Sequence, residues 1–234
     1  MTHQEITDHL HSLADSERAE HAIRYFKTAA GEYGHGDKFL GIRVPVIRHA
    51  VKKFADTSLG TAKKLLKSEY HEIRLFALLL LVSRFAKGSA AEQGEIYRLY
   101  LNHTRYINNW DLVDSSAPYI VGAYLADKDK GILYELALSA SLWERRIAVL
   151  ATFWFIRDAC FNDALHIAGQ LLNDTEDLLH KAVGWMLREV GKRDLATEVA
   201  FLKAHHQNMP RTMLRYAIEK FSEAERQKYL RNQA

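Results

Sequence analysis

Proline, glycine and cysteine are all scarce in this chain of 234 residues, which has 3 Pro, 12 Gly and 1 Cys. The low Pro and Gly counts exclude collagen-like and low-complexity structure, and a hydrophobic content of 48% excludes intrinsic disorder. The single cysteine, Cys160, cannot form an internal disulfide, which is typical of proteins from a reducing compartment. Because it lies between Ala159 and Phe161, we expect Cys160 to be a small core residue and not a nucleophile.

Long hydrophobic segments are also missing. The longest apolar run, residues 75–82, is too short to cross a bilayer, and the first five residues lack the basic region and apolar core of a secretory signal. We therefore expect a soluble, cytoplasmic protein that does not contact membranes. A formal net charge of +3 is only a mild indication of an anionic partner, because many proteins that never bind nucleic acid share it.

Hydrophobic residues recur with the period of an α-helix along most of the chain. One series at positions i, i+3, i+4 and i+7 consists of Ile147, Leu150, Ala151 and Trp154. Convincing alternating strands and Asn-Gly or Asp-Gly hairpin turns are absent from the sequence. We expect Pro45 and Pro210 in first helical turns and Pro118 at a kink or a helix start. The sequence predicts an all-α fold of roughly a dozen short helices.

A pattern in which a cation opens an apolar helix, with an alanine close behind, recurs along the chain. The marker residues are separated by 36, 36, 35 and 34 positions, and they are Arg74, Trp110, Arg146, Lys181 and Arg215. This spacing predicts about five helix pairs of 34–36 residues over residues 69–234, stacked into a solenoid. Residues 1–68 fit the period less well, so we expect them to form an irregular cap on a single domain of residues 1–234. The alternative is that any all-α protein has helices about this far apart.

The marker cations are candidates for binding a nucleic acid. If the second helix of each pair lines an inner surface, then Arg74, Arg146, Lys181 and Arg215 form a ladder that suits a phosphate backbone. The alternative is that these side chains pair with neighbouring carboxylates or remain in solvent.

Trp110 and Asp114 lie four residues apart, so on a helix they share one face. Trp185 lies four residues beyond Lys181, in the register that Asp114 has relative to Trp110. We therefore expect the two indoles and the carboxylate to converge near Arg146 and Arg188. The alternatives are that each Trp is a core residue and that Asp114 caps the segment before Pro118.

Four ordered blocks of the sequence resemble the AlkD-type DNA alkylation repair glycosylases. The blocks cover residues 39–45, 110–115, 143–148 and 181–189, and the last contains the unusual pattern G-W-x-L-R-E. The resemblance implies a right-handed α-solenoid of HEAT-like repeats with a concave DNA-binding face. It also implies excision of N3- and N7-alkylated purines from duplex DNA by an enzyme without a base-binding pocket.

The resemblance also implies roles for individual residues. Trp110, Trp185 and Asp114 match the aromatic pair and the catalytic carboxylate of the family. Arg146 matches an arginine next to the DNA backbone, Arg188 is a weaker match to another such cation, and Arg145 is an alternative to Arg146. One departure from the family is the segment of residues 31–37, which lacks the ending of a P-loop and which we expect to be a flexible connection.

We expect no cofactor and no metal, because no H-E-x-x-H or paired-cysteine motif occurs in the sequence. The expected partner is double-stranded DNA with alkylated purines, bound by a monomer that works at the nucleoid and has no obligate protein partner. Two other functions stay open. One is a non-catalytic HEAT-repeat module for damaged or branched DNA, and the other is a protein-binding scaffold.

Overall fold

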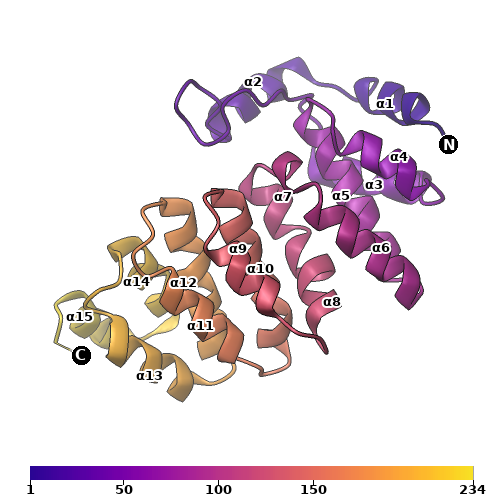
Figure 1. Cartoon of the computed structure of the whole chain (residues 1–234). Coiled ribbons are helices and arrows are strands. Elements are labelled where there is room, and N and C mark those ends of the chain that lie inside the picture. The colour runs from indigo at the N-terminus through magenta and orange to yellow at the C-terminus, as the bar shows by residue number, and fades with distance from the viewer. Residues whose placement is uncertain (234) are drawn as a thin grey trace. The chain divides into compact units, whose positions relative to one another are not determined.

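The computed structural model describes residues 1–233, which are helical apart from connecting loops and one isolated β-bridge between Lys38 and Tyr70 (Figure 1). The all-α prediction is confirmed, since no β-strand occurs within this part of the chain. None of the helices described combines the length and the apolar character of a membrane span.

The helices form two compact units, Met1–Ile120 and Val121–Ala234. This division does not fall near residue 68, where the sequence analysis places the end of a cap. A single domain with a cap and about five repeats stays a prediction.

Unit 1 is arranged around one buried helix. Its elements are α1 (His3–His11), α2 (Ser16–Tyr25), α3 (Val44–Lys53), α4 (Leu59–Leu65), α5 (His71–Phe85), α6 (Ala90–Leu101), η1 (Thr104–Tyr106) and α7 (Trp110–Asp114). α3, α4, α6 and α7 all pack against α5. The apolar run of residues 75–82 lies within α5 and is almost entirely buried, as expected for a helix that is hydrophobic all round.

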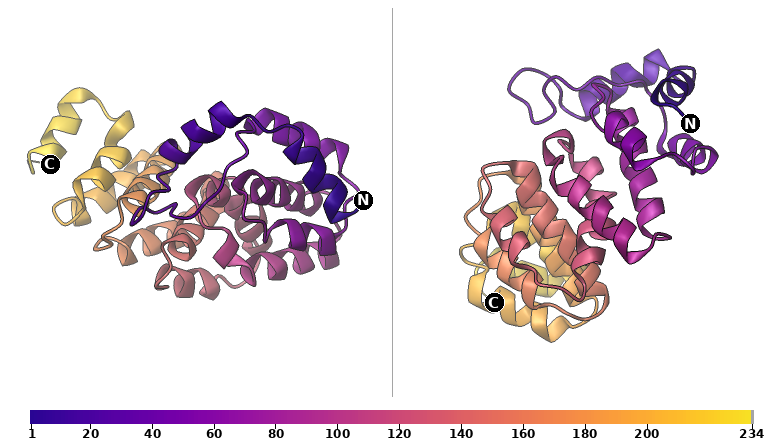
Figure 2. Two further views of the ribbon diagram at one scale, coloured as in Figure 1. Left: turned by 90° about the horizontal axis from the view of Figure 1, so that it is seen from above. Right: turned by 45° about the vertical axis from the view of Figure 1, so that its right-hand side comes forward.

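The connection between α2 and α3, residues 26–43, is fixed to α5 by one carboxylate. The oxygens of buried Glu72 accept hydrogen bonds from the main-chain N–H groups of Leu40 (2.9 Å), Gly41 (2.8 Å) and Ile42 (3.3 Å). Gly41 has φ +76°, and a Cβ at this position would collide with the Asp15 carbonyl oxygen, so the turn requires glycine. Figure 2 shows this connection from two further sides as the loop that follows α2. It delivers aromatic and acidic side chains to α5 and α7.

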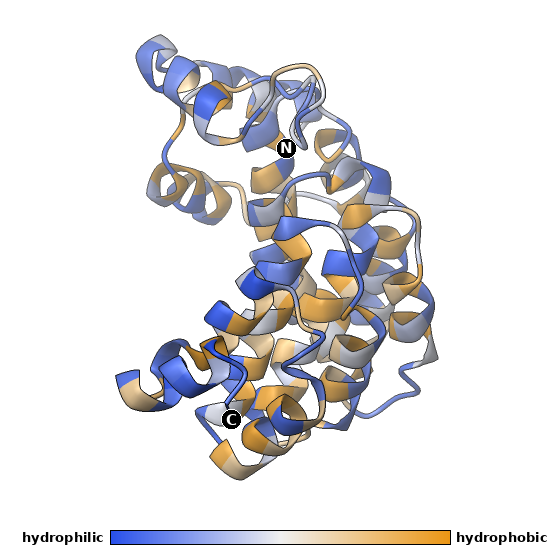
Figure 3. Cartoon of the chain, turned by 90° about the vertical axis from the view of Figure 1, so that its left-hand side faces the viewer, coloured by the Kyte–Doolittle hydropathy of each residue, from blue (hydrophilic) through white to orange (hydrophobic). Residues whose placement is uncertain are grey.

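Unit 2 is a stack of helix pairs. Its elements after the π-helical segment η2 (Pro118–Gly122) are α8 (Ala123–Leu125), α9 (Gly131–Ala137), α10 (Leu142–Arg157), α11 (Asn162–Gln170), α12 (Asp177–Gly191), α13 (Leu195–His205), α14 (Arg211–Ala217), η3 (Ile218–Lys220) and α15 (Glu223–Leu230). α9 packs on α10, α11 on α12, and α13 on α12, while α10, α12 and α14 contact one another in order. Figure 3 shows hydrophobic and hydrophilic residues alternating along the helices of the chain, as expected for amphipathic helices.

The helix starts follow local sequence signals. Pro45 is the second residue of α3, Pro210 is the N-cap of α14, and Pro118 opens η2. The five marker residues all lie within the first five residues of a helix, and these helices are α5, α7, α10, α12 and α14. One expectation is wrong: Cys160 is exposed and not part of the core, because it follows a turn in which Ala159 has φ 57° after the end of α10.

Candidate functional site

The short helix α7 carries two of the three predicted active-site residues. It begins where the side chain of Asn109 accepts the Trp110 N–H at 2.9 Å, which satisfies one of the free donors at the helix start. Leu112 and Val113 are buried within unit 1. Trp110 and Asp114, at the two ends of this helical turn, are both partly exposed. The prediction that they share one helical turn is therefore met.

Aromatic rings from the end of α2 and the following connection hold the Trp110 indole. Phe26 stacks on Trp110 with ring centroids 5.5 Å apart, and Tyr25 meets it edge-on at 6.1 Å. Phe26 also stacks on Phe39 at 5.0 Å. Offset stacking of this kind fixes the orientation of an aromatic ring. The indole plane is thus set by residues about 85 positions away in the sequence.

A buried charge network lies behind this aromatic cluster. His71, the first residue of α5, is 2% exposed, and its ring nitrogens lie 3.2 Å from Asp37 and 2.8 Å from Asp111. Burial by itself would lower the pKa of His71, but the Asp111 and Asp37 carboxylates raise it to about 9. The imidazole is therefore a cation at neutral pH, and it joins the α2–α3 connection to the start of α7.

Arg74 completes this network. Its guanidinium donates to Asp37 at 2.7 Å and to the carbonyl oxygens of Ser68 (3.0 Å) and Glu69 (3.2 Å). The whole residue is only 3% exposed. Arg74 is thus paired with a carboxylate, which is the alternative to DNA binding given in the sequence analysis. A contact between Arg74 and DNA stays a prediction.

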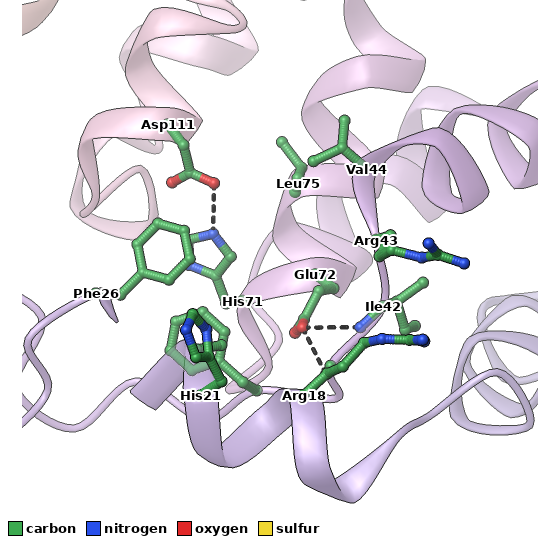
Figure 4. A pocket seen from close by; sticks show the side chains of 13 residues that line it. Arg18, His21, Phe26, Ile42, Arg43, Val44, His71, Glu72, Leu75 and Asp111 are labelled. Carbon is green, nitrogen blue, oxygen red and sulfur yellow. Dashed lines mark hydrogen bonds and ion pairs between the residues drawn. The ribbon is translucent and has the colours of Figure 1, made fainter. Parts of the chain in front are cut away.

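A cavity of about 250 Å³ opens beside the network, within unit 1 (Figure 4). Its walls are mostly apolar and come from α2, the α2–α3 connection and α5. Asp111, His71 and Phe26 lie at one side of it, and Arg43 and Arg18 lie at the other. Trp110 and Asp114 do not line this cavity.

The third predicted active-site residue, Trp185, lies on α12 in unit 2. Its Nε1–H donates to Glu189 at 3.2 Å, and Phe153 lies beside the indole at 6.2 Å. Lys192 (2.5 Å) and Arg193 (3.2 Å) also donate to the Glu189 carboxylate. Burial alone would raise the pKa of Glu189, but these hydrogen bonds outweigh it and lower the pKa. Glu189 therefore stays ionised and holds the indole.

The rest of the G-W-x-L-R-E pattern also has a structural role. A Cβ on Gly184 would collide with the Met213 carbonyl oxygen and lie 2.6 Å from the Tyr216 Cβ, so glycine is what lets α14 approach α12 this closely. Leu187 is in the core, and Arg188 is ion-paired with Glu219. Each residue that made the pattern recognisable is thus involved in packing or pairing.

The predicted DNA-binding cations of unit 2 differ in how exposed they are. Arg146 is 5% exposed, and its guanidinium donates to the Leu178 carbonyl oxygen. Arg145 is paired with Asp174 at 2.7 Å and has 15% of its side chain exposed, the same fraction as Arg188. Lys181 is 40% exposed and is paired with Asp177, and Arg215 is exposed. Lys181 and Arg215 are therefore the cations most available to a phosphate.

The structure brings Trp110 and Asp114 together in unit 1, and it puts Trp185, Arg145, Arg146, Lys181, Arg188 and Arg215 in unit 2. Convergence of Trp185 with the α7 pair stays a prediction. Sequence reasoning missed Phe26, Asp37, His71 and Asp111. The available signals were that Asp111 directly follows Trp110 and that His71 opens the helix that carries Arg74. We expected residues 31–37 to be a flexible connection. The last of them, Asp37, is instead buried and forms ion pairs with His71 and Arg74.

Residues 1–233 contain no group of three or more His, Cys, Asp or Glu side chains that could hold a metal ion. The network around His71 has its charges satisfied by other protein groups.

Comparison with known families gives a match over residues 6–221 to the family described as DNA alkylation repair enzyme. This chain belongs to that family. Membership supports an enzymatic role with DNA as the substrate. Comparison with curated proteins gives no match.

Two solved structures share the fold. A predicted DNA alkylation repair enzyme from Enterococcus faecalis is 17% identical with a TM-score of 0.68, and the alignment covers 90% of this chain and 97% of that one. The protein smu.31 from Streptococcus mutans UA159 is also 17% identical, with a TM-score of 0.57, and the alignment covers 94% of this chain and 99% of that one. At this identity the likeness establishes the family fold and nothing finer.

Proposed function

We propose that this member of the family is a DNA glycosylase that hydrolyses the N-glycosidic bond of positively charged N3- and N7-alkylated purines in duplex DNA. The observation that carries the proposal is the pair on α7: an indole and a carboxylate, both partly exposed, at the two ends of one helical turn. Trp185 on α12 is the third residue of the proposed site.

The chemistry of the substrate suits a site with a carboxylate and aromatic rings. An N3- or N7-alkylated purine is already cationic, so it leaves readily when the bond from C1′ to the purine nitrogen breaks. The bonding electron pair goes to the purine and neutralises it, while positive charge develops on the deoxyribose. A water oxygen then forms the new bond to C1′ and loses a proton. No oxidant or cofactor is required.

Asp114 is the proposed stabiliser of the charge on the sugar. A carboxylate beside an oxocarbenium-like sugar lowers the free energy of the transition state, and it can also position the water and accept its proton. The Trp110 and Trp185 indoles are proposed to favour the cationic lesion, since a cation over an indole face is stabilised by about 0.5–2 kcal/mol. The stack of Phe26 on Trp110 supports this role because it holds the ring in one orientation.

Binding of the duplex is proposed to involve Lys181 and Arg215, the exposed cations of the predicted set, with Arg145, Arg146 and Arg188 acting nearer the protein interior. We further propose that the protein acts as a cytoplasmic monomer at the nucleoid. The non-catalytic DNA-binding module is the second candidate, because the exposed Lys181 and Arg215 suit a duplex whether or not Asp114 acts in catalysis.

The test is release of free base from duplex DNA that contains 7-methylguanine, with wild type compared with Asp114→Asn. We expect release by wild type and a loss of about 10²–10³-fold in Asp114→Asn, the usual effect of removing a group that stabilises transition-state charge. Asp127→Asn is the matched control, because Asp127 is 81% exposed and lies on the loop before α9. Trp110→Leu should lose about 2–30-fold.

Equal release by Asp114→Asn and wild type would refute the role of the carboxylate. Absence of release, together with retained binding to the duplex, would favour the non-catalytic module. If the protein bound neither damaged nor intact duplex, the glycosylase and the non-catalytic module would both be refuted, and the protein-binding scaffold would remain.

A further inference from the structure

We propose that the cavity in unit 1 binds a single unpaired nucleotide of DNA, with the base inside the cavity and its phosphate at the mouth. This inference rests on the proposed function only in taking DNA as the source of the nucleotide. The cavity is separate from the proposed catalytic residues, since neither Trp110 nor Asp114 lines it. The nucleotide that it takes is therefore not the one being excised, and excision itself still needs no base-binding pocket.

The walls of the cavity suit a flat, largely apolar group. Phe26 and Phe39, which stack on each other, both line the cavity, and Ile42, Val44 and Leu75 contribute aliphatic surface. A cavity of about 150 Å³ is sufficient for benzene. The space of about 250 Å³ therefore has room for a purine, which is two fused rings, but not for a base pair. Apolar walls with a few fixed polar groups are what small planar ligands select.

One side of the cavity presents a hydrogen-bond acceptor. Asp111 lines it there, with 17% of its side chain exposed, and Figure 4 shows its carboxylate directed toward the His71 ring. One Asp111 oxygen accepts from His71 and the other from the Leu112 N–H (2.9 Å), which fixes the carboxylate in place. Each carboxylate oxygen has a second lone pair, so Asp111 can also accept from an amino group on a base. Adenine, guanine and cytosine carry such a group, and thymine does not.

The other side presents cations. Arg43 and Arg18 extend from this side in Figure 4. Arg18 is 52% exposed and pairs with Asp15, whereas the Arg43 guanidinium is exposed and has no partner among residues 1–233. Glu72 also lines the cavity, but its oxygens already accept three main-chain N–H groups. An unpaired guanidinium at the mouth of an apolar cavity is well suited to a phosphate.

The acceptor, the apolar middle and the cations occur in the order in which a nucleotide carries its amino group, its ring and its phosphate. A bare anion would leave the apolar walls in contact with water, and a nucleoside would leave Arg43 without a partner. An unpaired nucleotide satisfies all three parts of the cavity at once. Because a paired base has its amino group and ring inside the duplex, the cavity selects a nucleotide that has left the stack.

The test uses the full chain and isothermal titration with deoxyadenosine monophosphate. We expect a dissociation constant of about 0.1–1 mM for this small ligand. Arg43→Gln should weaken binding about 5–10-fold, and Val44→Trp, which fills the mouth from a position that is 43% exposed, should abolish it. Arg48→Gln is the matched control: it removes the same charge from an exposed position outside the cavity, on α3, the helix that begins directly after Arg43, and should bind like wild type. Thymidine monophosphate should bind more weakly than deoxyadenosine monophosphate.

The source of the nucleotide is tested with two duplexes of the same sequence, one fully paired and one with a single bulged adenosine. Wild type should prefer the bulged duplex, and Arg43→Gln should lose that preference while Arg48→Gln keeps it. Equal binding of inorganic phosphate and deoxyadenosine monophosphate, or equal loss in Arg43→Gln and Arg48→Gln, would overturn the proposal. A preference for the free mononucleotide with none for the bulge would overturn DNA as the source.

Release of 7-methylguanine by the same variants separates this proposal from the proposed function. Base release without any mononucleotide binding would refute the cavity proposal alone. Mononucleotide binding that follows the variants as expected, without base release, would leave the cavity proposal standing and refute the glycosylase.

Discussion

Replacing His71 by glutamine should destabilise the protein most strongly at acidic and neutral pH. In the folded protein the imidazolium lies between Asp37 and Asp111, and Phe26 and Phe39 cover its ring at centroid distances of 4.9 Å and 4.7 Å. Glutamine can form one of the two hydrogen bonds but carries no charge. Asp37 keeps its ion pair with Arg74, so the substitution leaves the largely buried Asp111 carboxylate without a cation, which is a strongly destabilising change.

The magnitude follows from the pKa of His71. Its folded value of about 9 lies above the ordinary 6.5, and each unit corresponds to about 1.4 kcal/mol, so the charged form contributes about 3 kcal/mol. A group whose pKa is raised on folding stabilises the protein fully below its unfolded pKa. This stabilisation is lost as the pH rises from 6.5 through about 9. Removing one partner of a buried ion pair typically costs about 3–5 kcal/mol, which agrees with the value obtained from the pKa of His71.

The assay is urea unfolding of wild type and His71→Gln from about pH 6 to about pH 9.5, followed by tryptophan fluorescence and circular dichroism. We expect the difference in unfolding free energy to be largest near pH 6 and to shrink by about 3 kcal/mol across this range. His103→Gln is the control, because His103 is also buried in unit 1 but bonds a main-chain carbonyl, that of Leu99, at 2.8 Å. Parallel pH profiles for wild type and His71→Gln would refute a charged His71.

Two further predictions concern unit 2. Burial raises the pKa of Glu198 from 4.5 to about 8, although the charge of nearby Arg188 acts to lower it. The neutral carboxyl group therefore contributes fully to stability below pH 4.5, and its contribution is lost as the pH rises through about 8. Glu198→Gln should remove that pH dependence from urea unfolding, and an unchanged slope would contradict it. Gly184→Ala should lower stability by about 1–3 kcal/mol through overpacking against α14. Gly169 lies on α11, where a Cβ would meet nothing within 4 Å, so Gly169→Ala should raise stability by about 0.5–1 kcal/mol. Changes in melting temperature of the same sign in both glycine variants would contradict the packing argument.

Local features of the fold could be predicted from the sequence because they depend on residues a few positions apart. The helical period placed Leu150 and Ile147 in the core, and the spacing of Trp110 and Asp114 placed them on one helical turn. The proline positions marked helix starts for the same reason. The ordered motifs also indicated the right family. In the G-W-x-L-R-E block, each of the named residues has a fixed role in packing or pairing.

Burial and pairing of charges could not be predicted in this way. Arg74 and Arg146 occupy equivalent sequence positions to Lys181 and Arg215, yet the first two are buried and bonded to protein groups while the others are exposed to different extents. Whether a helix-opening cation faces solvent depends on what the preceding loop places over it. Cys160 was misjudged for a related reason, because the turn after α10 lies at the surface.

The helices, the turn that presents Trp110 and Asp114, and the family follow from residues that lie close together along the chain. The ion pairs of Asp37 with His71 and Arg74, and the stack of Phe26 on Trp110, arise only when the chain folds. These partners lie 34, 37 and 84 positions apart, and no periodic pattern connects them. The physical reason is that a long connection is brought to α5 by the Glu72 hydrogen bonds and by Gly41, so its aromatic and acidic side chains acquire their partners only once the chain has folded.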